Sequence, residues 1–243
     1  RPDLRWPFPD RMAERLTGAR VEWLRRRSKY ILVDLESGES LLVHLGMSGR
    51  LRVLPKDTPP LKHDHLDLVL SSGKILRFHD PRRFGSVLWI TGLPSEHRLL
   101  AALGPEPFDQ ELRPEYLYRL SRGKKVTVKQ FIMDGKIVVG VGNIYANEAL
   151  FLAGLDPRRA AGNISAARYK SLTATIKQVL AKAIEQGGTT LKDFAQTDGK
   201  PGYFAQHLNV YGRKGEPCEV CGKAIESKVI GQRNTFFCVH CQR

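Results

Sequence analysis

The sequence has few cysteines and no long apolar run. It has 4 Cys in 243 residues, and all of them follow Pro217. A disulfide framework would normally be spread through a small secreted chain, so this clustering indicates a metal site and a reducing compartment. No run of about 18 apolar residues occurs, so we expect no membrane-spanning helix. The segment Arg1–Pro7 has no apolar stretch, so we expect no signal peptide.

Acidic residues are also scarce relative to basic ones. Lys and Arg number 39 against 25 Asp and Glu, which gives a net charge of +14 and a pI of about 9.8. A surplus of this size is common in proteins that bind phosphates. Composition alone, however, favours a nucleic-acid-binding protein no more than a soluble basic protein without such a partner. A membrane-surface protein is less favoured, because no strongly basic amphipathic helix stands out.

The first part of the chain has the pattern of antiparallel strands. Short apolar runs alternate with turns rich in Gly, Ser and Asp, which is typical of a sandwich or barrel. The runs cover residues 30–35, 41–45, 51–54, 66–70, 75–78 and 87–90. A short helix over about residues 9–16 precedes them.

The pattern changes at Gly104-Pro105-Glu106-Pro107, because two prolines stop both strand and helix. Helical periodicity follows over residues 109–120, with Arg113-Pro114 starting a helix or turn inside this stretch, and over residues 126–133, 143–153 and 165–186. Ser165 is expected to cap the last helix, and Gly187-Gly188 to end it. Residues 189–206 are polar and have the composition of a loop. We therefore expect an α+β protein with an amino-terminal domain (1–104), a helical domain (105–206) and a carboxy-terminal segment (207–243).

The cysteines form two CxxC motifs with 16 residues (222–237) between them. Each motif offers two thiolates from one tight turn, and two facing turns complete a tetrahedron around Zn²⁺. The four predicted ligands of one structural zinc ion are Cys218, Cys221, Cys238 and Cys241. Redox dithiols are the alternative, but they usually lie near a βαβ unit. His240 is expected to be exposed rather than a ligand, and the residues between the motifs suit a β-hairpin.

Two glycine-containing segments suggest phosphate binding. Arg233 lies near the tip of the zinc-bound hairpin, where a guanidinium could grip a phosphate or simply be solvated. Gly140-Val141-Gly142-Asn143 leads into a helix, and the backbone N–H groups there attract phosphate. Asn143 could cap that helix or donate to a phosphate. Glycine pairs before helices are common, so this second motif alone is weak.

Three further segments have open interpretations. Asp80–Gly85 places two guanidiniums beside Phe84, which suits either a loop that wedges a DNA base step or an ordinary turn with a core phenylalanine. Residues 62–65 (Lys-His-Asp-His) suit a metal site or an alternating strand. Residues 25–29 form a basic run entering a strand, which is usually a solvated face.

Together these segments resemble the formamidopyrimidine-DNA glycosylases, bacterial enzymes that remove oxidised purines from DNA. The matching stretches occur in the family's order and cover nearly the whole chain. They are residues 44–49, 62–65, 80–85, 139–146 and 198–204, and the zinc hairpin with Gln232-Arg233. The resemblance implies an antiparallel β-sandwich domain, a helix–two-turn–helix domain and a zinc-finger β-hairpin. DNA would lie in the cleft between the domains, with the damaged nucleotide flipped out of the stack.

The resemblance also implies residue roles. The positions that fill the vacated space match Met47, Arg82 and Phe84, with Arg82 facing the estranged cytosine and Phe84 wedging the step. The phosphate-gripping positions match His63, Lys124, Asn143 and Arg233. Lys29 matches a lysine assigned to proton transfer in strand cleavage, and Arg233 is also assigned to the second elimination. Residues 200–204 match the lid over the flipped base.

The start of the chain departs from the family pattern. Family members begin with a free proline followed by glutamate, and the proline amine attacks the sugar C1′ to form a Schiff base. Here Arg1 blocks the nitrogen of Pro2 in an amide, and residues 4–7 match a segment well inside the first domain. We therefore expect a fragment, or a chain whose beginning was not recorded, that binds DNA better than it cuts it.

The expected function is base-excision repair. The chain would excise 8-oxoguanine and formamidopyrimidines from double-stranded DNA and nick the abasic site by β,δ-elimination. We expect a monomer in the bacterial cytoplasm, associated with the nucleoid. One alternative is an endonuclease VIII-like enzyme that prefers oxidised pyrimidines, but the Arg82–Phe84 pair and residues 198–204 favour the purine enzyme. The other is a non-catalytic zinc-ribbon protein that binds lesion DNA, for which the Met47, Arg82 and Phe84 trio would have no use.

Overall fold

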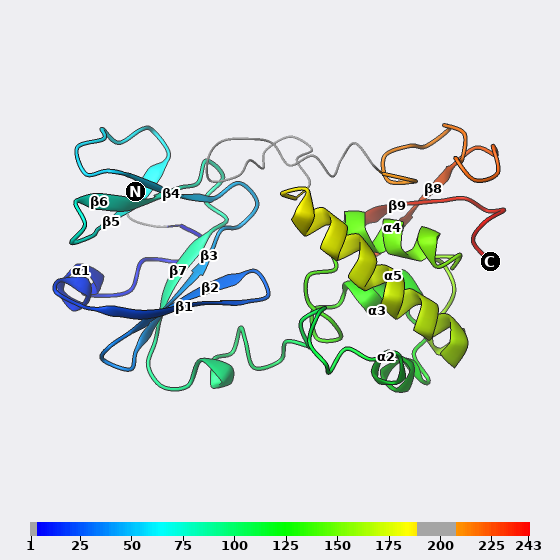
Figure 1. Ribbon diagram of the computed structural model, residues 1–243, viewed down its shortest axis with the longest axis horizontal. Helices are drawn as coiled ribbons and strands as arrows, with labels where there is room; N and C mark the ends of the chain where they lie inside the picture. Colours follow the sequence, from blue (N-terminus) through cyan, green and yellow to red (C-terminus); the bar gives the residue numbers. More distant parts are fainter. Residues whose placement is uncertain (1–3, 189–207) are drawn as a thin grey trace. The chain divides into compact units, whose positions relative to one another are not determined.

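The computed structural model describes residues 4–188 and 208–243. The expected loop at residues 198–204 lies outside these ranges. The described chain forms two compact units. One comprises residues 4–101, and the other comprises residues 102–188 and 208–243. Figure 1 labels their helices and strands.

The amino-terminal unit contains two antiparallel sheets. One has the strand order β1-β2-β3-β7 and the other β4-β6-β5. A short helix, α1 (Met12–Leu16), precedes the strands, and a 3-10 turn, η1 (Pro94–Glu96), follows them. The strands are β1 (Val21–Arg27), β2 (Tyr30–Leu35), β3 (Ser40–His44), β4 (Arg50–Pro55), β5 (Asp64–Val69), β6 (Lys74–His79) and β7 (Ser86–Ile90).

The core of this unit lies between the two sheets. Leu35 and Leu41 of the first sheet and Phe78 of the second are 2%, 1% and 0% exposed, and they belong to one apolar cluster. The alternation of apolar residues in β2, β3 and β6 therefore points one face of each strand inward. The predicted antiparallel β-sandwich is confirmed.

Two elements differ from what the sequence pattern indicated. Residues 21–27 form strand β1, although the sequence pattern indicated only a basic run before a strand. Trp23 and Leu24 are 69% and 70% exposed at the edge of the sheet, so no inward alternation marks this strand. Of the helical stretch expected over residues 109–120, residues 109–113 are not helical, and α2 begins at Pro114, where the sequence indicated a start. Proline suits the first helical position, because the N–H it lacks would have no partner there.

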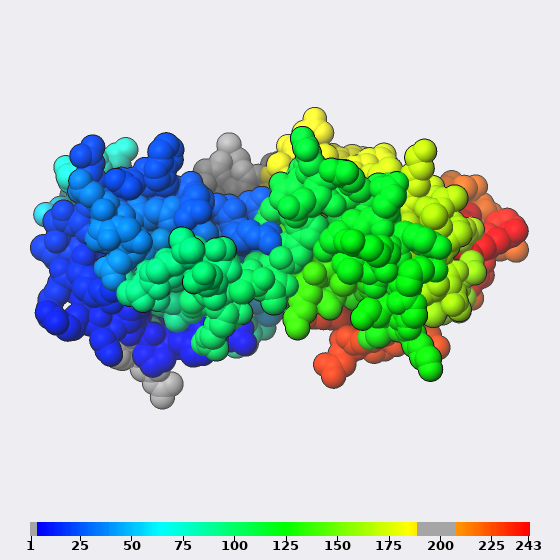
Figure 2. All heavy atoms as spheres, turned by 90° about the horizontal axis from the view of Figure 1, so that it is seen from below, coloured from blue at the N-terminus to red at the C-terminus, as the bar shows by residue number. Residues whose placement is uncertain are grey.

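The second unit is built around a packed group of helices. They are α2 (Pro114–Ser121), α3 (Val128–Met133), α4 (Asn143–Leu152), the 3-10 turn η2 (Ala161–Asn163) and α5 (Ala166–Glu185). Helix α5 packs against α2 and α4, and α2 and α5 are neighbours on the surface in Figure 2. Ser165 accepts a hydrogen bond from the Arg168 N–H, as predicted for the cap. No helix in the described ranges is long and apolar enough to cross a membrane.

The zinc segment is part of the same compact unit as these helices. Strands β8 (Glu226–Ile230) and β9 (Arg233–Phe237) form a two-stranded hairpin, and β9 packs beside α4 (Figure 1). Gly231 and Gln232 in the turn have φ angles of 55° and 61°. Two successive left-handed residues are typical of the tightest hairpin turn, which matches the right-handed twist of the strands. The turn therefore fixes where β9 and Arg233 begin.

Candidate nucleic-acid interface and zinc centre

Two loops of the amino-terminal unit, residues 45–49 and 80–85, touch backbone to backbone. Gly46 has a φ of 69°, and a Cβ atom there would lie 2.6 Å from Phe84 C and 2.6 Å from Gly85 N. Only glycine allows both this conformation and this approach. The contact brings together Met47 and Phe84, which lie far apart in the sequence. We call these two segments the wedge loops.

A buried carboxylate joins the wedge loops. Asp80 is 0% exposed, and its two oxygens accept hydrogen bonds from Ser48 Oγ and from the Gly85 N–H, each at 2.8 Å. The Asp80 carbonyl oxygen lies 2.8 Å from His65 Nε2. Because each carboxylate oxygen has a donor, the charge can remain buried. The loops are thereby rigid enough to hold exposed side chains.

The side chains predicted to fill the space left by a flipped nucleotide lie on the surface of these loops. Met47 is 60% exposed and Phe84 is 45% exposed. The Arg82 guanidinium carbon lies 4.9 Å from the centre of the Phe84 ring, within cation–π range. The alternative of a core phenylalanine in this turn was therefore wrong. An exposed aromatic ring beside a cation suits insertion between bases.

His63 is linked to the wedge loops through their backbone. Its carbonyl oxygen accepts the Asp80 N–H at 2.9 Å, and its ring packs edge-on against His79 at 5.9 Å. His79 Nδ1 lies 2.8 Å from Asp64 Oδ1, in the first residue of β5. Among the described residues, the one group of side chains that could hold a metal ion is the cysteine cluster. The strand interpretation of residues 62–65 is therefore favoured over a metal site.

Lys29 lies in the turn between β1 and β2, near a histidine that the sequence analysis did not select. Burial and the positive charges of Lys29 and Arg5 lower the pKa of His44 to about 4. Its Nδ1 accepts the Gly46 N–H at 3.0 Å. The ring is therefore neutral near pH 7, with its remaining proton on Nε2. His44 belongs to the matching stretch 44–49, but nothing local gave it a role; its position beside Lys29 and the wedge loops is seen only in the structure.

In the second unit, a buried lysine and an asparagine hold the zinc hairpin. Lys129 on α3 is 1% exposed, and its Nζ donates to Asn234 O at 3.0 Å and to Thr235 Oγ1 at 2.7 Å. Asn143 Nδ2 donates to the same Asn234 carbonyl at 3.1 Å. Burial and the positive charge of Arg233 lower the pKa of Lys129 to about 8. The exposed Arg233 thus projects from a hairpin that two helices hold.

Asn143 does not cap its helix. Gly142 occupies the cap position of α4 and Asn143 the first helical position, so the cap interpretation was wrong. Its Oδ1 is buried without a hydrogen-bond partner in the described chain. One turn further on, Asn147 Oδ1 accepts the Phe236 N–H at 2.7 Å. Helix α4 therefore orients both Asn143 and the hairpin strand.

Glu148 anchors the segment that leads into the zinc segment. It is 1% exposed, and its carboxylate accepts four hydrogen bonds of 2.8–3.0 Å from Asn209, Val210 and Tyr211. Four donors compensate the burial of this charge without a cation. Sequence reasoning missed both Glu148 and Lys129, because their partners lie far along the chain and a charged residue in a helix is usually exposed.

Lys124 is exposed in the turn after α2, in the same unit as Asn143 and Arg233. Its carbonyl oxygen accepts the Gly162 N–H at 3.0 Å. A Cβ atom at Gly162 would lie 2.9 Å from that oxygen, so a glycine is required for the approach. The predicted residues therefore form two groups, one in each unit. The first is Lys29, Met47, His63, Arg82 and Phe84, and the second is Lys124, Asn143 and Arg233.

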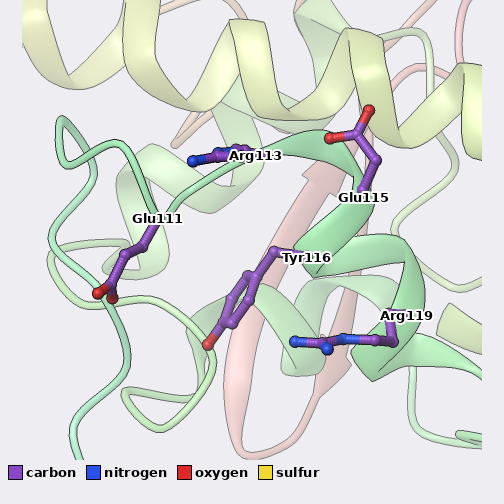
Figure 3. Close-up of a pocket in the computed structure, with 5 residues that line it drawn as sticks. All are labelled: Glu111, Arg113, Glu115, Tyr116 and Arg119. Atoms are coloured by element: carbon purple, nitrogen blue, oxygen red, sulfur yellow. The ribbon is translucent and has the colours of Figure 1, made fainter.

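A pocket on α2 has a different character. Figure 3 shows its lining of Glu111, Arg113, Glu115, Tyr116 and Arg119. Two carboxylates balance two guanidiniums, and the Tyr116 hydroxyl already donates to Ile137 O at 3.1 Å. A lining without net charge has no electrostatic preference for a polyanion. We therefore place no part of the nucleic-acid interface there.

The cysteines form a closed tetrathiolate group. Their four Sγ atoms lie within 4.8 Å of one another, with 3.9 Å between Cys218 and Cys241 and 3.5 Å between Cys221 and Cys238. A tetrahedral site with Zn–S bonds of about 2.3 Å requires sulfur–sulfur distances of about 3.8 Å. The residues therefore fit one structural Zn²⁺ ion with no open position, as predicted. His240 is exposed and is not part of the group.

The zinc centre has its own small core. Cys218 and Cys238 pack with Phe151 of α4, Val210 and Ile225. Gln242 bridges the second cysteine turn to the helical part: its Oε1 accepts the Cys238 N–H at 2.9 Å and its Nε2 donates to Leu155 O at 2.8 Å. Zinc binding is thereby coupled to the position of the hairpin relative to α4.

Three protein-family models match the chain in order. Residues 1–87 match the formamidopyrimidine-DNA glycosylase N-terminal domain, and residues 103–195 match the H2TH domain of the same glycosylase. Residues 215–243 match a zinc finger found in FPG and IleRS. The three matches correspond to the β-sandwich, the helical part and the cysteine hairpin.

Curated relatives match almost the whole chain. A formamidopyrimidine-DNA glycosylase from Alteromonas mediterranea is 70% identical over 241 residues, which are 99% of this chain and 88% of that protein. One from Syntrophotalea carbinolica is 56% identical over 242 residues, 100% of this chain and 89% of that protein.

Solved structures show the same fold. The MutM (Fpg) protein from Thermus thermophilus has a TM-score of 0.82 at 39% identity and covers 93% of this chain and 84% of its own. Lactococcus lactis Fpg with Fapy-dG-containing DNA has a TM-score of 0.85 at 31% identity, covering 95% and 84%. The predicted combination of β-sandwich, helix–two-turn–helix domain and zinc finger is confirmed. The chain belongs to the formamidopyrimidine-DNA glycosylase family.

Proposed function

We propose that this protein excises oxidised purines from double-stranded DNA and nicks the resulting abasic site by β,δ-elimination. The observation that carries the proposal is the exposed group of Met47, Arg82 and Phe84 on rigid loops, in a chain of this glycosylase family. Solved relatives are complexes with DNA that contains Fapy-dG, an abasic site or carbocyclic 8-oxo-G. These lesions define the substrate class that we assign.

The wedge loops would act when the damaged nucleotide leaves the stack. Flipping leaves an apolar gap and an unpaired base, and its cost must be offset by side chains that fill the gap. Met47 and Phe84 supply exposed apolar surface. The Arg82 guanidinium supplies donors for the estranged cytosine, and its contact with the Phe84 ring keeps it beside the gap.

The remaining groups would grip the DNA backbone. Lys29 and the neutral His44 offer N–H donors beside the wedge loops. His63 is linked to the same loops through its hydrogen bond to Asp80. In the other unit, Lys124, Asn143 and Arg233 offer donors on rigid backbone. Phosphate contacts fix the position of the duplex without reading its sequence.

For the chemistry, the resemblance assigns the nucleophile to a free amino-terminal proline. It assigns Lys29 to proton transfer during strand cleavage and Arg233 to the second elimination. A Schiff base makes the sugar C2′ proton acidic, so its removal expels the 3′ phosphate, and a second elimination expels the 5′ phosphate. Cationic Lys29 and Arg233 would stabilise the phosphate leaving groups.

We further propose three functional domains, at residues 1–104, 105–206 and 207–243, with residues 198–204 contributing to recognition of the base. The division between compact units near residue 101 supports the first boundary, and the separate core of the zinc centre supports the last. We propose that the protein works as a monomer on the chromosome in the bacterial cytoplasm.

The substrate assignment is tested by excision from matched duplexes that carry one 8-oxoguanine or one oxidised pyrimidine. We expect the purine to be released at least about tenfold faster, since a pocket that hydrogen-bonds one base rejects another that leaves its groups unpaired. Faster pyrimidine release would favour the endonuclease VIII-like alternative. Lesion binding with no release of either base would favour the non-catalytic alternative.

A further inference from the structure

Gln130 on α3 has an oriented carboxamide beside the turn of the zinc hairpin. Its backbone N–H donates to Thr127 Oγ1 at 3.2 Å, and Thr127 Oγ1 in turn donates to Gln130 Oε1 at 3.0 Å. This closed pair of hydrogen bonds holds the amide oxygen toward Thr127. The amide NH₂ group therefore points away from Thr127.

The NH₂ group lies against the hairpin turn. A Cβ atom at Gly231 would be 2.9 Å from Gln130 Nε2 and 3.1 Å from its Cγ. Gly231 has a φ of 55°, so the turn requires glycine for its conformation and uses the absent side chain for this contact. Arg233 follows two residues later. The Gln130 carboxamide of α3 thus lies against the same turn from which Arg233 begins strand β9.

The donors of this amide find no acceptor in the part of the chain that the structure describes. No residue in the described ranges accepts a hydrogen bond from Gln130 Nε2, and the residue is exposed. Positive charge lies nearby, because the buried Lys129 ammonium is close enough to Arg233 for the two charges to interact. An oriented N–H donor with positive charge beside it is suited to bind an anion.

We propose that the Gln130 carboxamide binds a backbone phosphate of the DNA together with Arg233. This inference rests on the proposed function, because it takes Arg233 as a phosphate contact. Gln130 supplies one neutral, oriented donor and Arg233 supplies the charge. Such a pair positions a phosphate more narrowly than a flexible guanidinium does alone.

The test is the affinity of the full chain for two duplexes, one intact and one with a tetrahydrofuran abasic site, over a series of NaCl concentrations. Three variants are compared: Gln130→Ala, Gln130→Glu and Gln130→Lys. The same three changes at the exposed Gln110, in the same compact unit, serve as controls for altered charge. Zinc content and thermal unfolding confirm that each variant is folded.

We expect Gln130→Ala to weaken binding to both duplexes about threefold to tenfold, the range for the net contribution of one ordinary hydrogen bond at an exposed site. Gln130→Glu should weaken it further, because a carboxylate replaces the donor at the same shape. Gln130→Lys should steepen the dependence of log K on log salt by about 0.9, the value for one more phosphate contact.

The inference is overturned if the Glu and Lys variants behave like those at Gln110. A loss in Gln130→Ala alone would then reflect packing on Gly231. Arg233→Ala separates this failure from failure of the proposed function. If Arg233→Ala weakens binding while the Gln130 variants match their controls, only the role of Gln130 is lost. If the unmodified chain prefers no lesion and Arg233→Ala has no effect, the proposed function fails instead.

Discussion

The wedge loops and the zinc hairpin both present exposed side chains on tight turns, but they are anchored differently. The wedge loops depend on hydrogen bonds to one buried carboxylate, Asp80. The hairpin depends on four thiolates and on the buried ammonium of Lys129. The first anchor holds Met47 and Phe84, and the second holds Arg233.

This difference assigns different tasks to the two regions. Apolar side chains gain little from intact DNA, whose bases are stacked and covered, so the wedge loops should govern preference for a lesion. A guanidinium meets phosphates on any duplex, so the hairpin should govern total affinity and its dependence on salt. The two anchors and the two tasks can be separated by substitution.

Removal of the metal should have the largest effect, and only on the hairpin. We expect Cys238→Ser to lose zinc and to unfold the hairpin, because binding of a structural zinc ion contributes on the order of 10 kcal/mol to folding such segments. Metal analysis by atomic absorption and DNA binding measure the result. Val239→Ala, in the same turn but 41% exposed, is the matched control and should retain both. Zinc retained by Cys238→Ser would contradict the assignment.

Removal of the buried carboxylate should affect only the amino-terminal unit. Asp80→Ala leaves the Gly85 N–H and the Ser48 hydroxyl without their acceptor, which costs about 2–4 kcal/mol of unfolding free energy. Preference for lesion duplex should fall while zinc content stays unchanged. Ser48→Ala removes one of the two hydrogen bonds and should cost about 1 kcal/mol. Urea unfolding of the two variants measures these losses, and equal stability of Asp80→Ala and Ser48→Ala would contradict the role given to the carboxylate.

A smaller effect should appear as a pH dependence of the wedge loops. The folded-state pKa of His44 is about 4 against an ordinary 6.5, so between these values the unfolded chain binds the proton that the folded chain does not. Stability should therefore fall as pH drops from about 6.5 toward 4. In His44→Asn, an amide oxygen can still accept the Gly46 N–H, but nothing titrates. Thermal unfolding should show a smaller loss from pH 7 to pH 5 in this variant, and an identical loss would exclude His44 as the cause.

The sequence was sufficient wherever one local signal determined the structure. The paired CxxC motifs predicted the thiolate group, Ser165 predicted the start of α5, and the apolar runs predicted six of the strands that the structure contains. Strand β1 was missed because Trp23 and Leu24 at a sheet edge show no alternation between core and solvent.

The interior of the candidate site could not be predicted in the same way. Lys129 contacts a carbonyl 105 residues further along the chain, and Asn143 reaches the same carbonyl across 91 residues. No spacing rule connects such residues. The role of Asp80 could not be predicted for the same reason, because its carboxylate accepts a hydrogen bond from Ser48, 32 residues away. Sequence motifs located the exposed side chains, but only the three-dimensional structure shows the buried contacts that position them.

The central claim is that the wedge loops govern preference for a lesion and that the zinc hairpin governs total affinity. A crossed binding measurement tests it most directly. Phe84→Ala and Arg233→Ala are each titrated with intact duplex and with abasic-site duplex over a range of salt. We expect Arg233→Ala to weaken binding to both duplexes equally and to reduce the salt slope by about 0.9. Phe84→Ala should weaken binding to the lesion duplex alone and leave the slope unchanged. The same pattern of loss in both variants would contradict the account.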